Sequence, residues 1–150
     1  MKFDDTTEPV TGIYVAEDDT IYVTFRQVGY RLKMTTAGEL QQIGVGGVGI
    51  AYANETVYVI GTNHHLSCYP LANSADIRSL GDVYLDRCYM IEHELSTEII
   101  AYSASKVYEK MLPASPTSLD ALTDSDMTFD VTDSMSKLCC IPNPKYEYVV

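Results

Sequence analysis

The sequence has no tryptophan, few basic residues and no long apolar run. Only 10 Lys and Arg stand against 21 Asp and Glu, so the formal net charge is −11. Nucleic acid requires a positive track for its phosphates, and the basic residues here are scattered rather than clustered. The same charge disfavours binding to an anionic membrane surface. We therefore expect neither a nucleic-acid partner nor a membrane partner.

The chain also lacks the signals of export and of cysteine-based sites. Its first residues, MKFDDTTEPV, contain no apolar segment of a signal peptide, and no later stretch approaches the length that spans a bilayer. No C-x-x-C pair occurs among the four cysteines, which are Cys68, Cys88, Cys139 and Cys140. We expect a cytoplasmic protein with reduced thiols and no cofactor.

What is present is the alternation of apolar and polar residues that is typical of strands. Tyr occurs 12 times and Phe 3 times, and Tyr and β-branched residues favour half-buried strands. Residues 10–25, VTGIYVAEDDTIYVTF, are similar to residues 47–61, GVGIAYANETVYVIG. In both segments a Gly-Ile pair opens an alternation that crosses a polar turn and returns as Thr-[Ile/Val]-Tyr-Val. Each segment predicts a β-hairpin.

Two shorter strands follow each hairpin, so each unit has four antiparallel strands. The additional strands are expected at residues 29–35 and 38–44 in the first unit and at 64–71 and 75–81 in the second. Gly12 and Gly49 are equivalent and stand 37 residues apart, close to the period of a small propeller blade. The residues after the second unit match this pattern in outline. We therefore expect one domain over residues 1–150, with units at about 8–44, 45–81, 82–122 and 123–150.

The sequence therefore predicts an all-β fold of repeated four-stranded antiparallel units, like a β-propeller of about 3.5–4 blades. Closed propellers usually have about 4–8 blades. Either four small blades close alone, or a partner completes the ring, or the chain is a piece of something longer. An open stack would leave unpaired strand edges, so we expect the chain to form oligomers or to dock on another subunit.

The first unit carries a recognisable set of residues at Pro9, Gly12-Ile13, Asp18-Asp19, Ile21-Tyr22-Val23, Arg31-Leu32 and Gly38. The second unit keeps Gly49-Ile50 and Val57-Tyr58-Val59 but lacks the Pro and the Arg. Over about residues 8–71 this pattern resembles an NHL-type β-propeller repeat. The resemblance implies a scaffold that binds proteins, and sometimes RNA, on a loop face. RNA binding in that family relies on a basic face, which this chain lacks.

Residues 43–50, IGVGGVGI, match the G-x-G-x-x-G pattern of a dinucleotide-binding turn through Gly44, Gly46 and Gly49. That site requires a helix after the glycines to receive the pyrophosphate. The following residues alternate like a strand, so we expect no nucleotide site. Gly49 instead opens the second unit, and the other glycines permit a tight crossover in which backbone φ is positive.

Two histidine and cysteine clusters predict neither a metal site nor a redox site. His64, His65 and Cys68 share one predicted strand, where neighbouring side chains point to opposite faces and cannot converge on one ion. We expect two exposed histidines and a buried thiol. Cys139 and Cys140 would diverge in the same way, with one thiol buried and one exposed.

Five aspartates crowd one late region, namely Asp120, Asp124, Asp126, Asp130 and Asp133. The central Gly and terminal Glu of an EF-hand calcium loop are missing, so a solvated acidic loop that could dock a basic partner is expected.

No set of nucleophile, base and orienting residue emerges, so we expect no enzyme. The preferred function is a protein-interaction or assembly module that binds through loops on one face. Its expected contacts are Tyr30, His64, His65, Tyr69, Asp124 and Asp126. Two alternatives stay open. One is a structural subunit of a larger assembly, such as a viral or phage particle. The other is a carbohydrate-binding propeller in which Tyr substitutes for the absent Trp.

Overall fold

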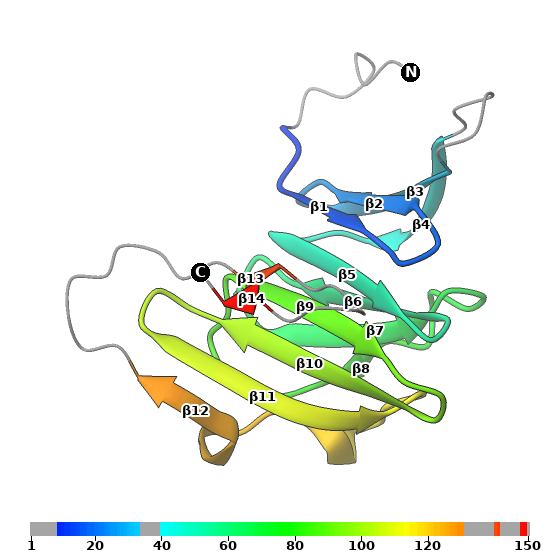
Figure 1. The fold of residues 1–150 in the computed structure, drawn as a ribbon. Coiled ribbons are helices and arrows are strands. Elements are labelled where there is room, and N and C mark those ends of the chain that lie inside the picture. The colour runs from blue at the N-terminus through cyan, green and yellow to red at the C-terminus, as the bar shows by residue number, and fades with distance from the viewer. Residues whose placement is uncertain (1–8, 34–39, 131–139, 142–147, 150) are drawn as a thin grey trace.

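The computed structural model of the chain describes residues 9–33, 40–130, 140–141 and 148–149. Three four-stranded antiparallel sheets follow one another along these residues, and a short two-stranded sheet lies near the C-terminus (Figure 1). The expectation of an all-β chain built from repeated four-stranded antiparallel units is confirmed. None of the described segments is a helix long and apolar enough to cross a bilayer.

Each large sheet is a meander in which strands that are neighbours in sequence are neighbours in space. The first sheet contains β1 (Gly12–Val15), β2 (Thr20–Thr24), β3 (Val28–Lys33) and β4 (Leu40–Val45). The second contains β5 (Gly49–Ala53), β6 (Thr56–Ile60), β7 (Leu66–Pro70) and β8 (Arg78–Ser79). The third contains β9 (Arg87–Glu92), β10 (Ser96–Tyr102), β11 (Lys106–Pro113) and β12 (Met127–Asp130). The short sheet pairs β13 (Cys140–Ile141) with β14 (Tyr148–Val149).

The predicted hairpins form at the predicted places because their turns accept left-handed backbone. Asn54 and Glu55, with φ of 48° and 59°, make the two-residue turn between β5 and β6. Two positive φ values in succession match the twist of the flanking strands. In the turn between β1 and β2, the backbone of Asp19 is also left-handed, with φ of 65°.

The second sheet lies between the other two, and its first strand, β5, contacts both β1 and β9 (Figure 1). All five residues of β6 are buried, as expected of a strand covered on both faces. The core is therefore centred on the second sheet, and large side chains such as Tyr22, Tyr58 and Leu112 fill it from all three sheets. The three sheets form no closed ring among the residues described.

The third sheet extends further than the sequence predicts. After β11 the chain makes two 3-10 turns, at Ser118–Asp120 and Asp124–Asp126, and then returns as β12 along β11. The predicted boundary at residues 122/123 thus falls inside this sheet. The start of a fourth unit expected near Met127 is instead the last strand of the third sheet, because the free edge of β11 is open to it.

The glycines of residues 43–50 serve close approach of backbones, and positive φ is not the reason for them. Among the described glycines only Gly81 has positive φ, at 106°. A Cβ on Gly46 would lie 2.0 Å from the carbonyl oxygen of Phe25, and one on Gly47 would lie 2.0 Å from that of Ile60. Gly49 begins β5 as Gly12 begins β1, as predicted.

Candidate functional site

An open pocket of about 650 Å³ lies where three loops of the second and third sheets meet. The first loop links β8 to β9, the second is the turn between β10 and β11, and the third contains the 3-10 turns before β12. The polar and aromatic side chains that matter most in its wall are Asp82, Tyr84, Ser103, Ser105, Lys106 and Asp124. We call it the Tyr84 pocket.

Tyr84 is 55 % exposed, although the residues on either side of it are buried. Val83 and Leu85 point into the core, so the alternation of an extended chain sends the Tyr84 ring outward. The ring stacks on the imidazole of His64, with centroids 4.3 Å apart and planes 10° from parallel. This contact fixes the orientation of an otherwise exposed aromatic ring.

His64 is held in place from several sides. Its backbone is left-handed, with φ of 66°, and its N–H donates to the carbonyl of Gly61 at 2.9 Å. The ring Nδ1 lies 3.0 Å from the carbonyl oxygen of Leu85 and 3.4 Å from a carboxylate oxygen of Asp86. Since the backbone N–H of Leu85 also donates to the carbonyl of His64 at 2.9 Å, the loop and the histidine support each other.

The charged side chains in the wall of the Tyr84 pocket have no hydrogen-bond or ion-pair partner among the described residues. Within the described part of the chain, the side chains of Asp82, Lys106 and Asp124 form no hydrogen bond and no ion pair. Polar groups around a concave surface that lack partners inside the protein are available to a ligand.

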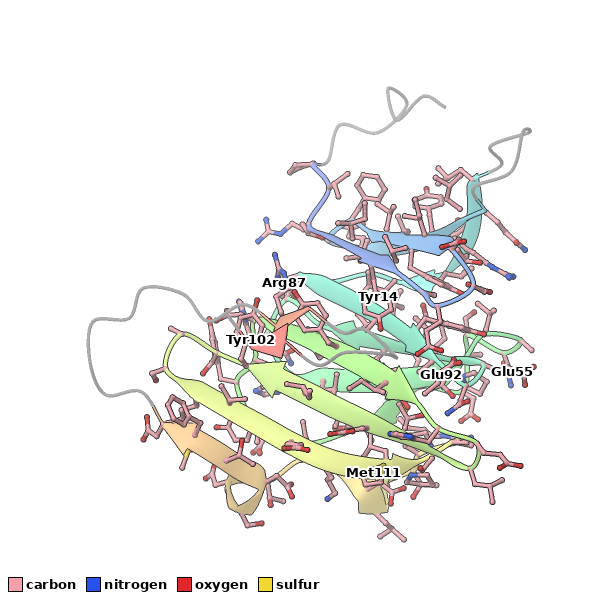
Figure 2. All side chains as sticks on the ribbon, viewed as in Figure 1. Tyr14, Glu55, Arg87, Glu92, Tyr102 and Met111 are labelled. Atoms are coloured by element: carbon pink, nitrogen blue, oxygen red, sulfur yellow. The ribbon has the colours of Figure 1, made fainter. Side chains whose placement is uncertain are left out.

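A second pocket, of about 470 Å³, lies at one end of β1, β5 and β9, the first strands of the three sheets. It is acidic. Its carboxylates come from the turn between β1 and β2, the turn between β5 and β6, and the end of β9, and they are Glu17, Asp18, Glu55 and Glu92. Figure 2 shows Glu55 and Glu92 near one another at that end. None of the described residues that line this pocket is a Lys, Arg or His. Its chemistry suits a positively charged group.

Hydrogen bonds and burial organise the acidic pocket. A carboxylate oxygen of Glu92 accepts from the backbone N–H of Asn54 at 2.6 Å. The Asn54 side-chain amide donates to the carbonyl of Ser96 at 2.9 Å and to the hydroxyl of Thr97 at 2.7 Å. Burial, and secondly the nearby carboxylate of Glu92, raise the pKa of Glu17. The second and third sheets are thus tied together at the pocket.

The structure brings together two of the six residues predicted to contact a partner. Asp124 lines the Tyr84 pocket, and His64 lies behind the Tyr84 ring. Asp126 instead caps its own turn, where its carboxylate accepts from the backbone N–H of Thr123 at 2.8 Å and lies 3.7 Å from Nζ of Lys110.

The other three predicted contacts lie elsewhere. Tyr30 packs edge-on against Phe25, with centroids 5.5 Å apart, and is half-buried. His65 is half-buried in the turn before β7. Tyr69 is fully buried, and its ring packs where a Cβ on Gly44 would stand. It is a core residue rather than a surface contact, since Gly44 leaves room for it to reach between sheets.

Tyr84 itself was not among the residues predicted from the sequence. Its signal was the segment from Val83 to Leu85, where a large aromatic stands between two aliphatic residues in an extended run. In a loop between two sheets, such a run has one buried and one exposed side.

The cysteines and histidines in the described part of the chain gather into no metal centre. No group of three or more His, Cys, Asp and Glu within the described ranges is placed to hold a metal ion. Cys68 and Cys88 are free thiols and buried, as expected for Cys68, while His64 and His65 are less exposed than predicted. The prediction for the pair at residues 139 and 140 concerns side chains outside the described part.

No protein-family model matches the chain, and a search of the curated proteins finds no relative.

Proposed function

We propose that the chain is a non-enzymatic protein-interaction and assembly module of the β-propeller type. In this proposal its three sheets are consecutive blades, and a second copy of the chain supplies the rest of the ring. The observation that carries the proposal is a pair of exposed apolar side chains on β1, those of Ile13 and Val15. The similarity of the first unit to an NHL-type repeat supports it.

These two side chains of β1 correspond to two side chains of β5 that the first sheet covers. In β5, Ile50 is 5 % exposed, and Tyr52 stacks on Tyr22 of the first sheet, with ring centroids 4.7 Å apart. The repeat makes Ile13 and Val15 the equivalents of Ile50 and Tyr52. In β1 these two residues are 66 % and 59 % exposed. The first sheet therefore presents the side chains of a contact between sheets without a sheet to cover them.

The third sheet exposes apolar side chains as well. Met111 on β11 and Phe129 on β12 are 54 % and 55 % exposed. Phe129 stands opposite Val107 in the β11–β12 pairing, and Met111 stands on the same face of β11 as Val107. If these faces meet head to tail, two copies of three sheets make a ring of six, within the usual range of about 4–8 blades. This favours a second copy as the occupant.

The test is the molar mass of the purified chain by light scattering, with a circular dichroism spectrum of the same sample. We expect a folded dimer that dissociates when Ile13→Asp and Val15→Asp are combined, because two charges would be placed in an apolar contact. The control is Leu95→Asp, at a position 83 % exposed in the turn between β9 and β10, which should leave the dimer intact. A wild-type chain that is a folded monomer at all concentrations overturns the proposal.

The same experiment distinguishes the proposed assembly module from the alternative of a structural subunit of a larger assembly. A head-to-tail contact whose rotation does not close gives an open filament or shell rather than a ring. A mass that grows with concentration beyond that of a dimer would favour the structural subunit.

A further inference from the structure

We infer that the Tyr84 pocket binds a neutral saccharide, with one face of a pyranose ring packed on the free face of Tyr84. The inference goes beyond assembly, because it assigns the chain a small-molecule ligand at a site distinct from Ile13 and Val15. It depends on the stacked aromatic ring, the free polar groups and their balance of charge.

The aromatic ring offers one face to the pocket. His64 covers one face of the Tyr84 ring, with ring centroids 4.3 Å apart, and does not line the pocket as Tyr84 does, so the proposal assigns the opposite face of the ring to the ligand. A sugar ring carries C–H groups on one face and hydroxyls around its edge. The C–H face of the sugar can therefore pack on the plane of an aromatic ring such as that of Tyr84. The hydroxyls at the edge of the sugar remain free to form hydrogen bonds.

The polar groups beside Tyr84 suit the hydroxyls of such a ring. The carboxylates of Asp82 and Asp124 accept hydrogen bonds, and the ammonium of Lys106 donates them. Bonds to charged partners are about twice as strong as neutral ones, and these side chains make none within the described part of the chain. Ser103 and Ser105 add hydroxyls that both donate and accept.

The balance of charge disfavours other ligand classes. Among the described residues of the pocket wall, two carboxylates stand against one ammonium, which leaves one net negative charge. That charge repels phosphates and carboxylates, while Lys106 opposes a cation. A neutral ligand with many hydroxyl groups uses all three charged groups. The volume of about 650 Å³ lies within the range of small-ligand pockets.

The experiment is a saturation-transfer NMR screen of the full-length chain. The probes are the methyl pyranosides of glucose, galactose, mannose, xylose and N-acetylglucosamine at millimolar concentration. We expect at least one to bind, with an affinity that titration calorimetry then measures. Tyr84→Ala should weaken that binding by at least about tenfold, whereas Tyr84→Phe should retain most of it because the stacking plane survives.

The matched control is Phe129→Ala, since Phe129 has the same 55 % exposure as Tyr84 but lies outside the pocket wall. It should leave sugar binding unchanged even if it weakens the dimer, which keeps the two proposals separable. Asp124→Asn, in an exposed turn, should also reduce binding and serves if Tyr84→Ala fails to fold. Binding of no pyranoside, or equal binding by wild type and by the folded Tyr84→Ala and Asp124→Asn variants, overturns the inference.

Discussion

The hydroxyl of Tyr14, on β1, hydrogen-bonds to both backbone groups of Met90, on β9. It donates to the Met90 carbonyl at 3.1 Å and accepts from the Met90 N–H at 3.3 Å. These residues are 76 positions apart in the chain, and the whole second sheet intervenes between them in sequence. The bond shows that the first strands of all three sheets converge, and Figure 2 shows Tyr14 beside them.

Tyr14→Phe should destabilise the chain by about 1–3 kcal/mol, because it leaves the buried N–H and carbonyl of Met90 without their partner. Denaturant unfolding followed by circular dichroism gives the free energy of unfolding. Tyr84→Phe removes a hydroxyl from an exposed ring and should change that energy by no more than about 0.5 kcal/mol. If the two variants lose equal stability, the Tyr14–Met90 bridge does not stabilise the fold.

Gly47→Ala should destabilise the chain by about 3 kcal/mol, at the upper end of the cost of overpacking. The new Cβ would meet the Ile60 carbonyl oxygen at 2.0 Å, and a backbone oxygen in a paired strand has little freedom to move. Gly61→Ala is the control, because its Cβ would meet a side-chain oxygen of Asn63 at 3.0 Å and the nearest backbone atom, the His65 carbonyl oxygen, only at 3.8 Å. Thermal unfolding compares the two, and a tolerated Gly47→Ala would contradict the close-approach explanation.

Cys68 and Cys88 should resist alkylation in the folded protein at pH 8. Burial raises the pKa of Cys68 to about 11 and that of Cys88 to about 12, so little of the reactive thiolate is present. Peptide mapping by mass spectrometry after treatment with iodoacetamide should find both residues unmodified without denaturant and modified with it. Rapid labelling of either one in the native protein would show that its strand opens readily.

Glu109→Gln should stabilise the chain at neutral pH by about 0.2–1 kcal/mol, the range for cross-strand pairs. Glu98 lies diagonally across the β10–β11 pair from Glu109, and interaction with its side chain, followed by burial, raises the pKa of Glu109 in the folded state. The Nε2 atom of His93 lies 3.5 Å from a carboxylate oxygen of Glu98.

A raised folded-state pKa means that the folded chain binds more protons than the unfolded chain above the ordinary value of 4.5. The stability of the wild type should therefore fall as the pH rises through the interval between 4.5 and the raised value. The advantage of Glu109→Gln should vanish below that interval and be complete above it. Melting temperatures across this range provide the measurement, and an advantage independent of pH would exclude proton sharing as the cause.

The hairpins were predictable because their determinants are local. A period of two places Tyr14 and Tyr22 on one face, and a polar turn between them closes the hairpin. The strand at Met127–Asp130 was assigned to the wrong unit because its pairing with β11 is formed across two 3-10 turns. Nothing in those four residues specifies which strand edge they meet.

The sequence by itself determined an all-β chain, its first two units of four strands and the turns within them, since alternation and turn residues act over a few positions. Only the tertiary structure decided which side chains are available for function. Tyr69 and Tyr84 are both tyrosines in extended segments, yet one is fully buried and the other 55 % exposed. The difference arises from what packs over each ring, and residues distant in sequence, such as Gly44 beside Tyr69, determine that packing.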